Sequence, residues 1–207
     1  MENLWYDKIA KFYDFFTALL YKKARLKLIN DLNIKKGDRV LVVACGTGQS
    51  FKFIHDKTGD NGEIIAFDYS QEMLNVARKR IAKNKWKNII LLNADARDID
   101  KRYFENAGIN TDFDIVIAEL AFTVIPEWKK VMNVMNSLMK ENGKIGILDW
   151  YREKNDWLTK IVDFLAKAET NRNIIEYASK LFDDFTVTGT FLFGNVFTAT
   201  GKKKPKS

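Results

Sequence analysis

Hydrophobic and polar residues alternate along this chain in a pattern typical of strands and helices that follow one another. Five short runs rich in Val, Ile and Leu recur, in the order RVLVVA, EIIAF, NIILL, DIVIAEL and KIGILDW. Unbroken apolar runs of this length favour parallel strands that are covered on both faces. Helices are predicted between them, over 48–57, 70–84, 98–107 and 126–140, with Pro126 in the first turn of the last helix and Asn142-Gly143 at its end.

The two flanking parts of the chain show other patterns. Residues 4–32 contain no Gly or Pro and carry apolar side chains at helical spacing, which predicts a helix, and residues 155–181 also look helical. FTVTGTFLF and NVFTATGKK then indicate two strands joined by Phe193-Gly194, and so short a connection makes the pair antiparallel. We therefore predict an α/β fold with a doubly wound, mostly parallel seven-stranded sheet, closed by an antiparallel hairpin.

Composition narrows the class of protein. A chain of 207 residues, 46% of them hydrophobic, suits one domain with a substantial core. Cys45 is the single cysteine, which excludes a disulfide scaffold, and with a single histidine no metal site is expected. We find no apolar run of about 18 residues and no signal-peptide pattern, so we expect a cytoplasmic protein.

Positive charge is concentrated in three clusters within a net charge of +7. One cluster spans Lys22 to Lys27, a second spans Arg78 to Lys87 without an acidic residue, and the third is the tail GKKKPKS. Such clusters attract anionic membranes or nucleic acid, and they are also found on ordinary solvated helix faces.

Acidic residues lie at the ends of four of the predicted strands, whereas the strands themselves carry almost no charge. They are Asp68, Asp95, Glu119 and Asp149, and the first strand ends in the glycine-containing loop VACGTGQS. Ligands of doubly wound sheets bind beyond the carboxyl ends of the strands. The sequence therefore predicts a ligand site with an acidic rim at this edge.

Two classes of cofactor compete for such a site. A dinucleotide site requires G-x-G-x-x-G, and the position of the last glycine is Phe51 in this chain, which disfavours a nicotinamide-dependent oxidoreductase. An acidic rim suits a cationic cofactor without phosphates, and S-adenosylmethionine is such a cofactor.

The motifs also carry a family resemblance. DRVLVVACGTGQS, AFDYSQEMLNVARKR, NADARD, FDIVIAELAF and LMKENGKIGILDW resemble a class I S-adenosylmethionine-dependent methyltransferase. The chain is similar to the ubiquinone/menaquinone biosynthesis methyltransferases and to small bacterial phospholipid N-methyltransferases, and the similarity covers about residues 5–150. It implies a single domain of Rossmann-like methyltransferase fold, with a helical lid at 1–36, a cofactor-binding core at 37–150, substrate-side helices and the hairpin at 151–201, and a basic tail at 202–207.

The resemblance also implies roles for individual residues. The loop Ala44, Cys45, Gly46, Thr47 and Gly48 would wrap the methionine part of the cofactor. Asp68 would hold the ribose hydroxyls, with Tyr69 and Met73 beside the adenine. Asp95 would accept a hydrogen bond from the adenine amino group, with Ala96 beside it. Glu119 would face the reaction centre, and Tyr13, with Tyr6, would come from the lid.

The chain departs from the family pattern at two positions. The family commonly has an acidic residue where this chain has Val42, and a glycine where it has Ala44. A cofactor-binding protein without catalysis is therefore an alternative.

Methyl transfer requires mainly alignment, and a base only when the acceptor must lose a proton. The candidate proton acceptors are Tyr13, Glu119, Asp149 and Tyr151.

The acceptor is indicated by the residues after the fourth strand and by the N-terminal helix. The sequence AELAFTVIP lacks the D/N-P-P-Y/F pattern of enzymes that methylate nucleic-acid bases, so nucleic acid is disfavoured. Crowded aromatic residues with lysines next to them are typical of an interfacial helix, or of a lid. We expect transfer to a hydrophobic acceptor, a phospholipid amine or a prenylated quinol, with peripheral contact at the inner face of an anionic membrane. A soluble small molecule is the alternative acceptor.

Overall fold

The structure is a computed structural model, and it describes residues 18–151 and 157–205. Most of the predicted lid, including Tyr6 and Tyr13, lies outside the described residues. Within the described part of the predicted helix 4–32, a helical turn at 18–20 leads into α2 (Lys22–Asp31).

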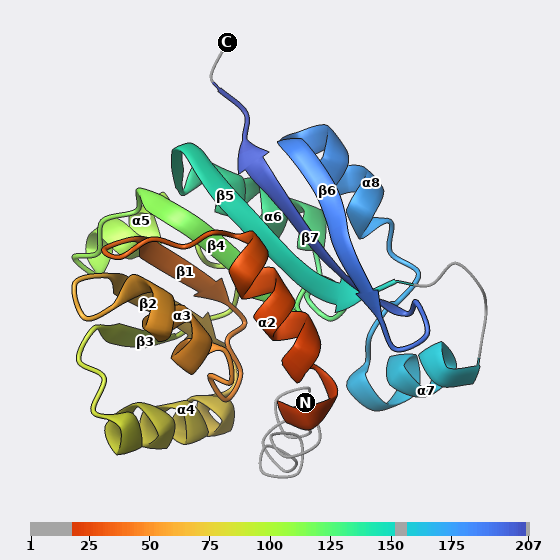
Figure 1. Cartoon of the computed structure of the whole chain (residues 1–207), viewed down its shortest axis with the longest axis horizontal. Helices are drawn as coiled ribbons and strands as arrows, with labels where there is room; N and C mark the ends of the chain where they lie inside the picture. The colour runs from red at the N-terminus through yellow and green to blue at the C-terminus, as the bar shows by residue number, and fades with distance from the viewer. Residues whose placement is uncertain (1–17, 152–156, 206–207) are drawn as a thin grey trace.

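A single seven-stranded sheet forms the centre of the described molecule, with the strand order β3-β2-β1-β4-β5-β7-β6 (Figure 1). Strands β1 to β5 are parallel to one another, whereas β7 runs antiparallel to both β5 and β6. The predicted mostly parallel sheet with a closing hairpin is therefore confirmed. The strands are β1 (Arg39–Val43), β2 (Glu63–Asp68), β3 (Ile89–Asn93), β4 (Phe113–Glu119), β5 (Met139–Trp150), β6 (Phe182–Phe191) and β7 (Val196–Lys203).

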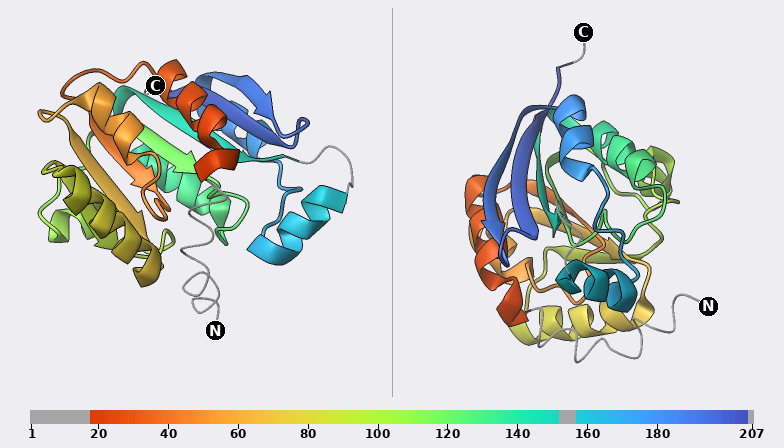
Figure 2. Two further views of the ribbon diagram at one scale, coloured as in Figure 1. Left: turned by 60° about the horizontal axis from the view of Figure 1, so that its bottom comes forward. Right: turned by 90° about the vertical axis from the view of Figure 1, so that its right-hand side faces the viewer.

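Helices cover both faces of the sheet, because side chains of the strands alternate between two apolar cores. Leu41 and Val43 of β1 pack in the core shared with α5, α6 and α8, whereas Val40 and Val42 pack in the core shared with α2, α3 and α4. The layers are seen edge-on in Figure 2, right. The helices after α2 are α3 (Phe51–Thr58), α4 (Gln71–Asn84), α5 (Lys101–Asn106), α6 (Trp128–Ser137), α7 (Trp157–Ala166) and α8 (Ile174–Leu181).

Two of the predicted helices differ from those in the structure. The helix predicted over 155–181 is two helices, α7 and α8, because the segment between them packs on the loop after β4, where the Glu169 N–H donates to the Thr123 carbonyl at 2.8 Å. The helix predicted over 126–140 begins only after Pro126 and ends at Ser137. Asn142, with a φ of 61°, lies within β5 at an irregularity of its pairing with β4.

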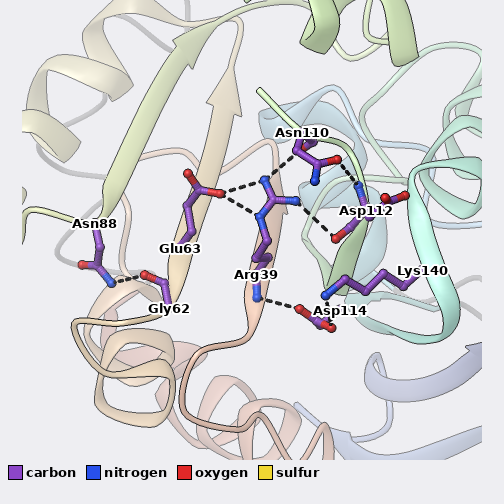
Figure 3. A network of polar contacts seen from close by, with 8 residues as sticks. All are labelled: Arg39, Gly62, Glu63, Asn88, Asn110, Asp112, Asp114 and Lys140. Carbon is purple, nitrogen blue, oxygen red and sulfur yellow. Dashed lines mark hydrogen bonds and ion pairs between the residues drawn. The ribbon is translucent and has the colours of Figure 1, made fainter. Parts of the chain in front are cut away.

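The edge of the sheet at the start of the parallel strands is held by a polar network around Arg39 (Figure 3). The Arg39 Nε donates to Glu63 at 2.9 Å, and its two terminal nitrogens donate to the carbonyls of Asp112 and Asn110 at 3.2 and 2.8 Å. The backbone N–H of Arg39 donates to Asp114. One side chain thus joins the starts of β1 and β2 to the segment that leads into β4.

We expect Arg39→Met to lower the free energy of unfolding by about 1–2 kcal/mol, because the variant leaves a carboxylate and two carbonyls without their donor. Urea denaturation measures the change. Lys101→Met is a matched control, since Lys101 only approaches Glu105 to 3.8 Å on an exposed helix and such pairs contribute about 0–1 kcal/mol. Equal effects of the two variants would contradict the role of the network.

Candidate cofactor and acceptor site

The loop after β1 turns sharply at the carboxyl edge of the sheet. Ala44, Gly46 and Gly48 have φ values of 49°, 54° and 71°, a left-handed conformation that glycine adopts at little cost. A Cβ on Gly48 would lie 2.4 Å from the ring of Phe51, the first residue of α3. The aromatic ring thus packs directly on the loop, in the position where a dinucleotide-binding loop carries its third glycine.

Asp68 at the end of β2 fixes the shape of this loop. Its Oδ2 accepts a hydrogen bond from the Gly46 N–H at 2.8 Å, and its Oδ1 accepts one from the Ser70 N–H at 2.9 Å. The side chain is buried and lines a cleft at the strand ends. The structure therefore brings together the loop and the acidic residue that the sequence predicts as one site.

The cleft has a volume of about 760 Å³. The ends of β1, β2 and β3 contribute predicted cofactor residues to its lining, namely Ala44, Asp68, Tyr69, Asp95 and Ala96. The loop between β4 and α6 and the start of α6 contribute the apolar Val124, Ile125, Pro126 and Trp128 and the charged Glu127, Lys129 and Lys130, and the segment after α7 adds Lys167, Glu169 and Arg172. The cleft therefore offers both polar and apolar contacts to a ligand.

Asp95 is held in place by Arg97, a residue that the sequence analysis did not single out. The Arg97 Nε and Nη2 donate to the two carboxylate oxygens at 3.0 and 2.6 Å, and the Arg97 N–H donates to Oδ1 at 2.9 Å. The guanidinium hydrogen bond holds the pKa of the Asp95 carboxyl below its usual value. The sequence NADARD could have indicated this pair, because the basic Arg97 follows the acidic Asp95 by two residues.

A second, smaller pocket of about 40 Å³ lies on the other side of the loop. Cys45, Gly46 and Thr47 line it together with Glu119 of β4 and Arg25 of α2. The structure thus places Glu119 behind the loop, and not among the residues that line the larger cleft. Burial raises the pKa of the Cys45 thiol, which keeps it protonated and unsuited to act as a nucleophile.

Two other predicted residues lie apart from the cleft lining. Met73 is buried in α4, where its backbone N–H donates to the Ser70 hydroxyl. Tyr151 packs edge-on against Phe197, with ring centroids 6.5 Å apart, and its N–H donates to the Asn195 carbonyl. Tyr13 lies outside the described residues.

Asp149 holds the loop between β4 and α6. Its carboxylate is fully buried and accepts from the Phe122 N–H at 2.7 Å, the Thr123 hydroxyl at 2.6 Å and the Trp150 N–H at 2.8 Å. Arg172, which the sequence analysis missed, donates to the Phe122 and Ile125 carbonyls of the same segment. The two side chains fix the loop between β4 and α6.

Burial raises the pKa of Asp149 from 3.8 to about 6, against the hydrogen bonds that lower it. A raised pKa stabilises the fold most below pH 4, and this contribution is lost as the pH rises through 6. We expect the stability of the wild type relative to Asp149→Asn to fall by roughly 3 kcal/mol between pH 4 and pH 7. Denaturant titrations of both proteins at several pH values measure the difference in their free energies of unfolding. A difference that does not change with pH would contradict the raised pKa of Asp149.

Two further findings concern the described residues only. None of their His, Cys, Asp and Glu side chains gather in a group of three that could hold a metal ion. Their helices are also too short or too polar to span a bilayer.

Comparison with known proteins identifies the family. A family model described as a methyltransferase domain matches residues 34–200. The chain belongs to this methyltransferase family. The predicted class I S-adenosylmethionine-dependent methyltransferase fold is thereby confirmed, and S-adenosylmethionine is the cofactor of the family.

Curated relatives of this methyltransferase domain include two demethylmenaquinone methyltransferases. The one from Bacillus pumilus is 30% identical over 148 residues, which are 70% of this chain and 60% of the relative. The one from Lactobacillus johnsonii is 29% identical over 155 residues, 72% of this chain and 61% of the relative. The methyltransferase chain thus spans about 60% of the length of these relatives.

Solved structures share the fold at low sequence identity. An S-adenosylmethionine-dependent methyltransferase from Aquifex aeolicus has a TM-score of 0.60 at 18% identity, over 87% of this chain and 93% of that one. Phosphoethanolamine N-methyltransferase 2 of Haemonchus contortus, in complex with S-adenosylmethionine, has a TM-score of 0.72 at 16% identity. The match covers 89% of this chain and 53% of that one.

Proposed function

We propose that the protein transfers the methyl group of S-adenosylmethionine to a ring carbon of a prenylated quinol. The apolar part of the cleft lining carries this proposal, because Val124, Ile125 and Trp128 line the same cleft as the strand ends, and its volume of about 760 Å³ is large enough for an aromatic ring beside the cofactor. The names of the relatives from Bacillus pumilus and Lactobacillus johnsonii support this acceptor.

The residues of the site fit the cofactor. Asp68 lines the cleft beside a left-handed loop, and the Phe51 ring packs where a pyrophosphate-binding loop would need a glycine. We assign the ribose hydroxyls to Asp68 and the adenine to Tyr69, Asp95 and Ala96. When bound, the cofactor supplies a methyl group that its sulfonium already activates.

The protein contributes mainly alignment and the exclusion of water. Transfer in line requires the acceptor carbon close to the methyl group, and the loop held by Asp149 and Arg172 provides a fixed surface for the acceptor ring. Tyr13, which lies outside the described residues, stays proposed as a proton acceptor for the quinol hydroxyl, whereas Tyr151 lies apart from the cleft lining and packs on Phe197.

A membrane surface would present such an acceptor. Leu19 and Leu20 are 79% and 50% exposed just before the lysines of α2, and Phe164 of α7 is 83% exposed. The start of α2 and α7 lie at the end of the molecule where the parallel strands finish (Figure 2, left). This arrangement supports a proposed peripheral contact with an anionic membrane at the inner face.

The test uses methyl-labelled S-adenosylmethionine with a short-chain demethylated menaquinol, and in parallel with a total lipid extract. Label in the quinol supports the proposal. Label in phosphatidylethanolamine would instead assign the phospholipid amine, and label confined to the aqueous phase would reject a hydrophobic acceptor. Absence of label in every fraction, with cofactor binding intact, would favour the non-catalytic alternative.

A further inference from the structure

The cleft at the strand ends carries more cations than its carboxylates neutralise. Of the basic side chains that line it, three pair with carboxylates of the same lining, at 2.6, 3.1 and 3.6 Å: Arg97 with Asp95, Arg172 with Glu169, and Lys130 with Glu127. The remaining lining carboxylate, Asp68, accepts hydrogen bonds from backbone N–H groups. Lys129 and Lys167 are the lining cations that these pairs leave over.

Lys129 is positioned by aromatic rings rather than by a carboxylate. Its ammonium lies over the rings of Trp128 and Tyr177, 5.4 and 5.5 Å from their centroids. A hydrogen bond from Lys180 at 2.5 Å, and to a smaller extent the charge of Lys129, hold the pKa of the Glu176 carboxyl below its usual value. Glu176 is therefore already paired, and within the described ranges no carboxylate oxygen lies within 4.0 Å of the Lys129 ammonium.

Lys167 comes from the segment that follows α7, and its backbone is left-handed, with a φ of 50°. A residue with a side chain adopts this conformation at a cost, and glycine is the usual residue at such a helix end. No carboxylate of the described residues pairs with Lys167 either. The Glu169 N–H of the same segment donates to the Thr123 carbonyl at 2.8 Å, so this segment is anchored to the loop that leads into α6 and to Lys129.

Two lysines beside apolar lining suit a ligand that combines an apolar body with a negatively charged oxygen. The sulfonium of a bound cofactor would strengthen this preference, because it adds a further positive charge to the cleft. We propose that Lys129 and Lys167 form a subsite that selects methyl acceptors carrying such an oxyanion. The inference deepens the proposed function, since a quinol with one ionised hydroxyl offers this oxygen, and so does the phosphate of a phospholipid.

The experiment compares two probes of nearly the same shape that differ in charge, 2-naphthoate and 2-naphthamide. Each is titrated calorimetrically into the protein saturated with S-adenosylhomocysteine. We expect the wild type to bind 2-naphthoate about tenfold more tightly than 2-naphthamide, and Lys129→Met/Lys167→Met to bind both about equally. Lys130→Met is the matched control, because its cation lines the same cleft but is paired with Glu127; it should keep the preference within about twofold.

Lys167→Gly tests the subsite in a protein whose fold is not weakened, since glycine suits the left-handed backbone. We expect a thermal midpoint no lower than that of the wild type, and a preference for 2-naphthoate reduced about threefold. A wild type that binds neither probe or shows no preference would overturn the inference, as would a double variant that keeps the preference.

A third probe, 2-naphthyl phosphate, separates the two sources of the oxyanion. Binding about tenfold tighter than that of 2-naphthoate would support the subsite with a lipid phosphate as its occupant, whereas equal or weaker binding supports the ring oxygen of a quinol. The inference and the proposed function fail separately in these assays. A wild type that prefers the anionic probes but methylates no quinol contradicts only the proposed acceptor, and one that methylates the quinol without this preference overturns only the subsite.

Discussion

Asp68→Ala is expected to weaken the binding of S-adenosylhomocysteine by about two orders of magnitude or more. The variant removes the acceptor for the Gly46 and Ser70 N–H groups, at 2.8 and 2.9 Å, and so releases the loop that separates the two cavities. It also removes the carboxylate that we assign to the ribose hydroxyls. Charge-assisted hydrogen bonds each contribute about 1.5–3 kcal/mol, so the two effects together account for the expected loss.

Isothermal titration with S-adenosylhomocysteine measures this effect, and circular dichroism checks that the variant is folded. Asp98→Ala is the control, because Asp98 is an exposed acid near the same rim and does not line the cleft. A loss of less than about tenfold would contradict the central role of Asp68, since one hydrogen bond alone changes affinity by about that much.

Asp149→Ala is expected to give the largest loss of stability, about 3–4 kcal/mol. The variant leaves the N–H groups of Phe122 and Trp150 and the Thr123 hydroxyl buried without an acceptor. Each such unpaired donor costs about 1–3 kcal/mol. The thermal midpoint should fall by about 10 °C for a protein of this size.

Differential scanning calorimetry is the measurement, with Asp183→Ala of the exposed strand β6 as a control that should change stability by less than about 0.5 kcal/mol. An Asp149→Ala protein as stable as this control would mean that water or a shifted loop satisfies the stranded donors. The loop between β4 and α6 would then be held by its other contacts, such as the hydrogen bonds from Arg172.

The strands and the place of the site could be predicted because they depend on local patterns. Unbroken apolar runs define β1 to β4 nearly to the residue, and acidic residues at their ends meet at one edge as parallel strands require. Asp68 beside Gly46 is the direct result, although 22 positions separate them.

The remaining features depend on contacts between distant segments, which periodicity does not report. The break between α7 and α8 arises from packing on the loop after β4, and Arg172 reaches carbonyls 47 and 50 positions away. Arg25 meets Glu119 across 94 positions, so a residue of a basic cluster becomes a buried partner of the site. Composition predicts such clusters, but it does not distinguish their buried members.

The antiparallel course of β7 brings the chain out of the sheet at the end opposite the cleft. Lys202 pairs with Lys144 at the start of the regular part of β5, so the chain leaves the sheet at the edge opposite the cleft. Figure 1 shows this end pointing away from α7 and the start of α2. A support or reporter coupled to the tail would therefore hold the protein with its cleft outward, open to a bilayer presented from the other side.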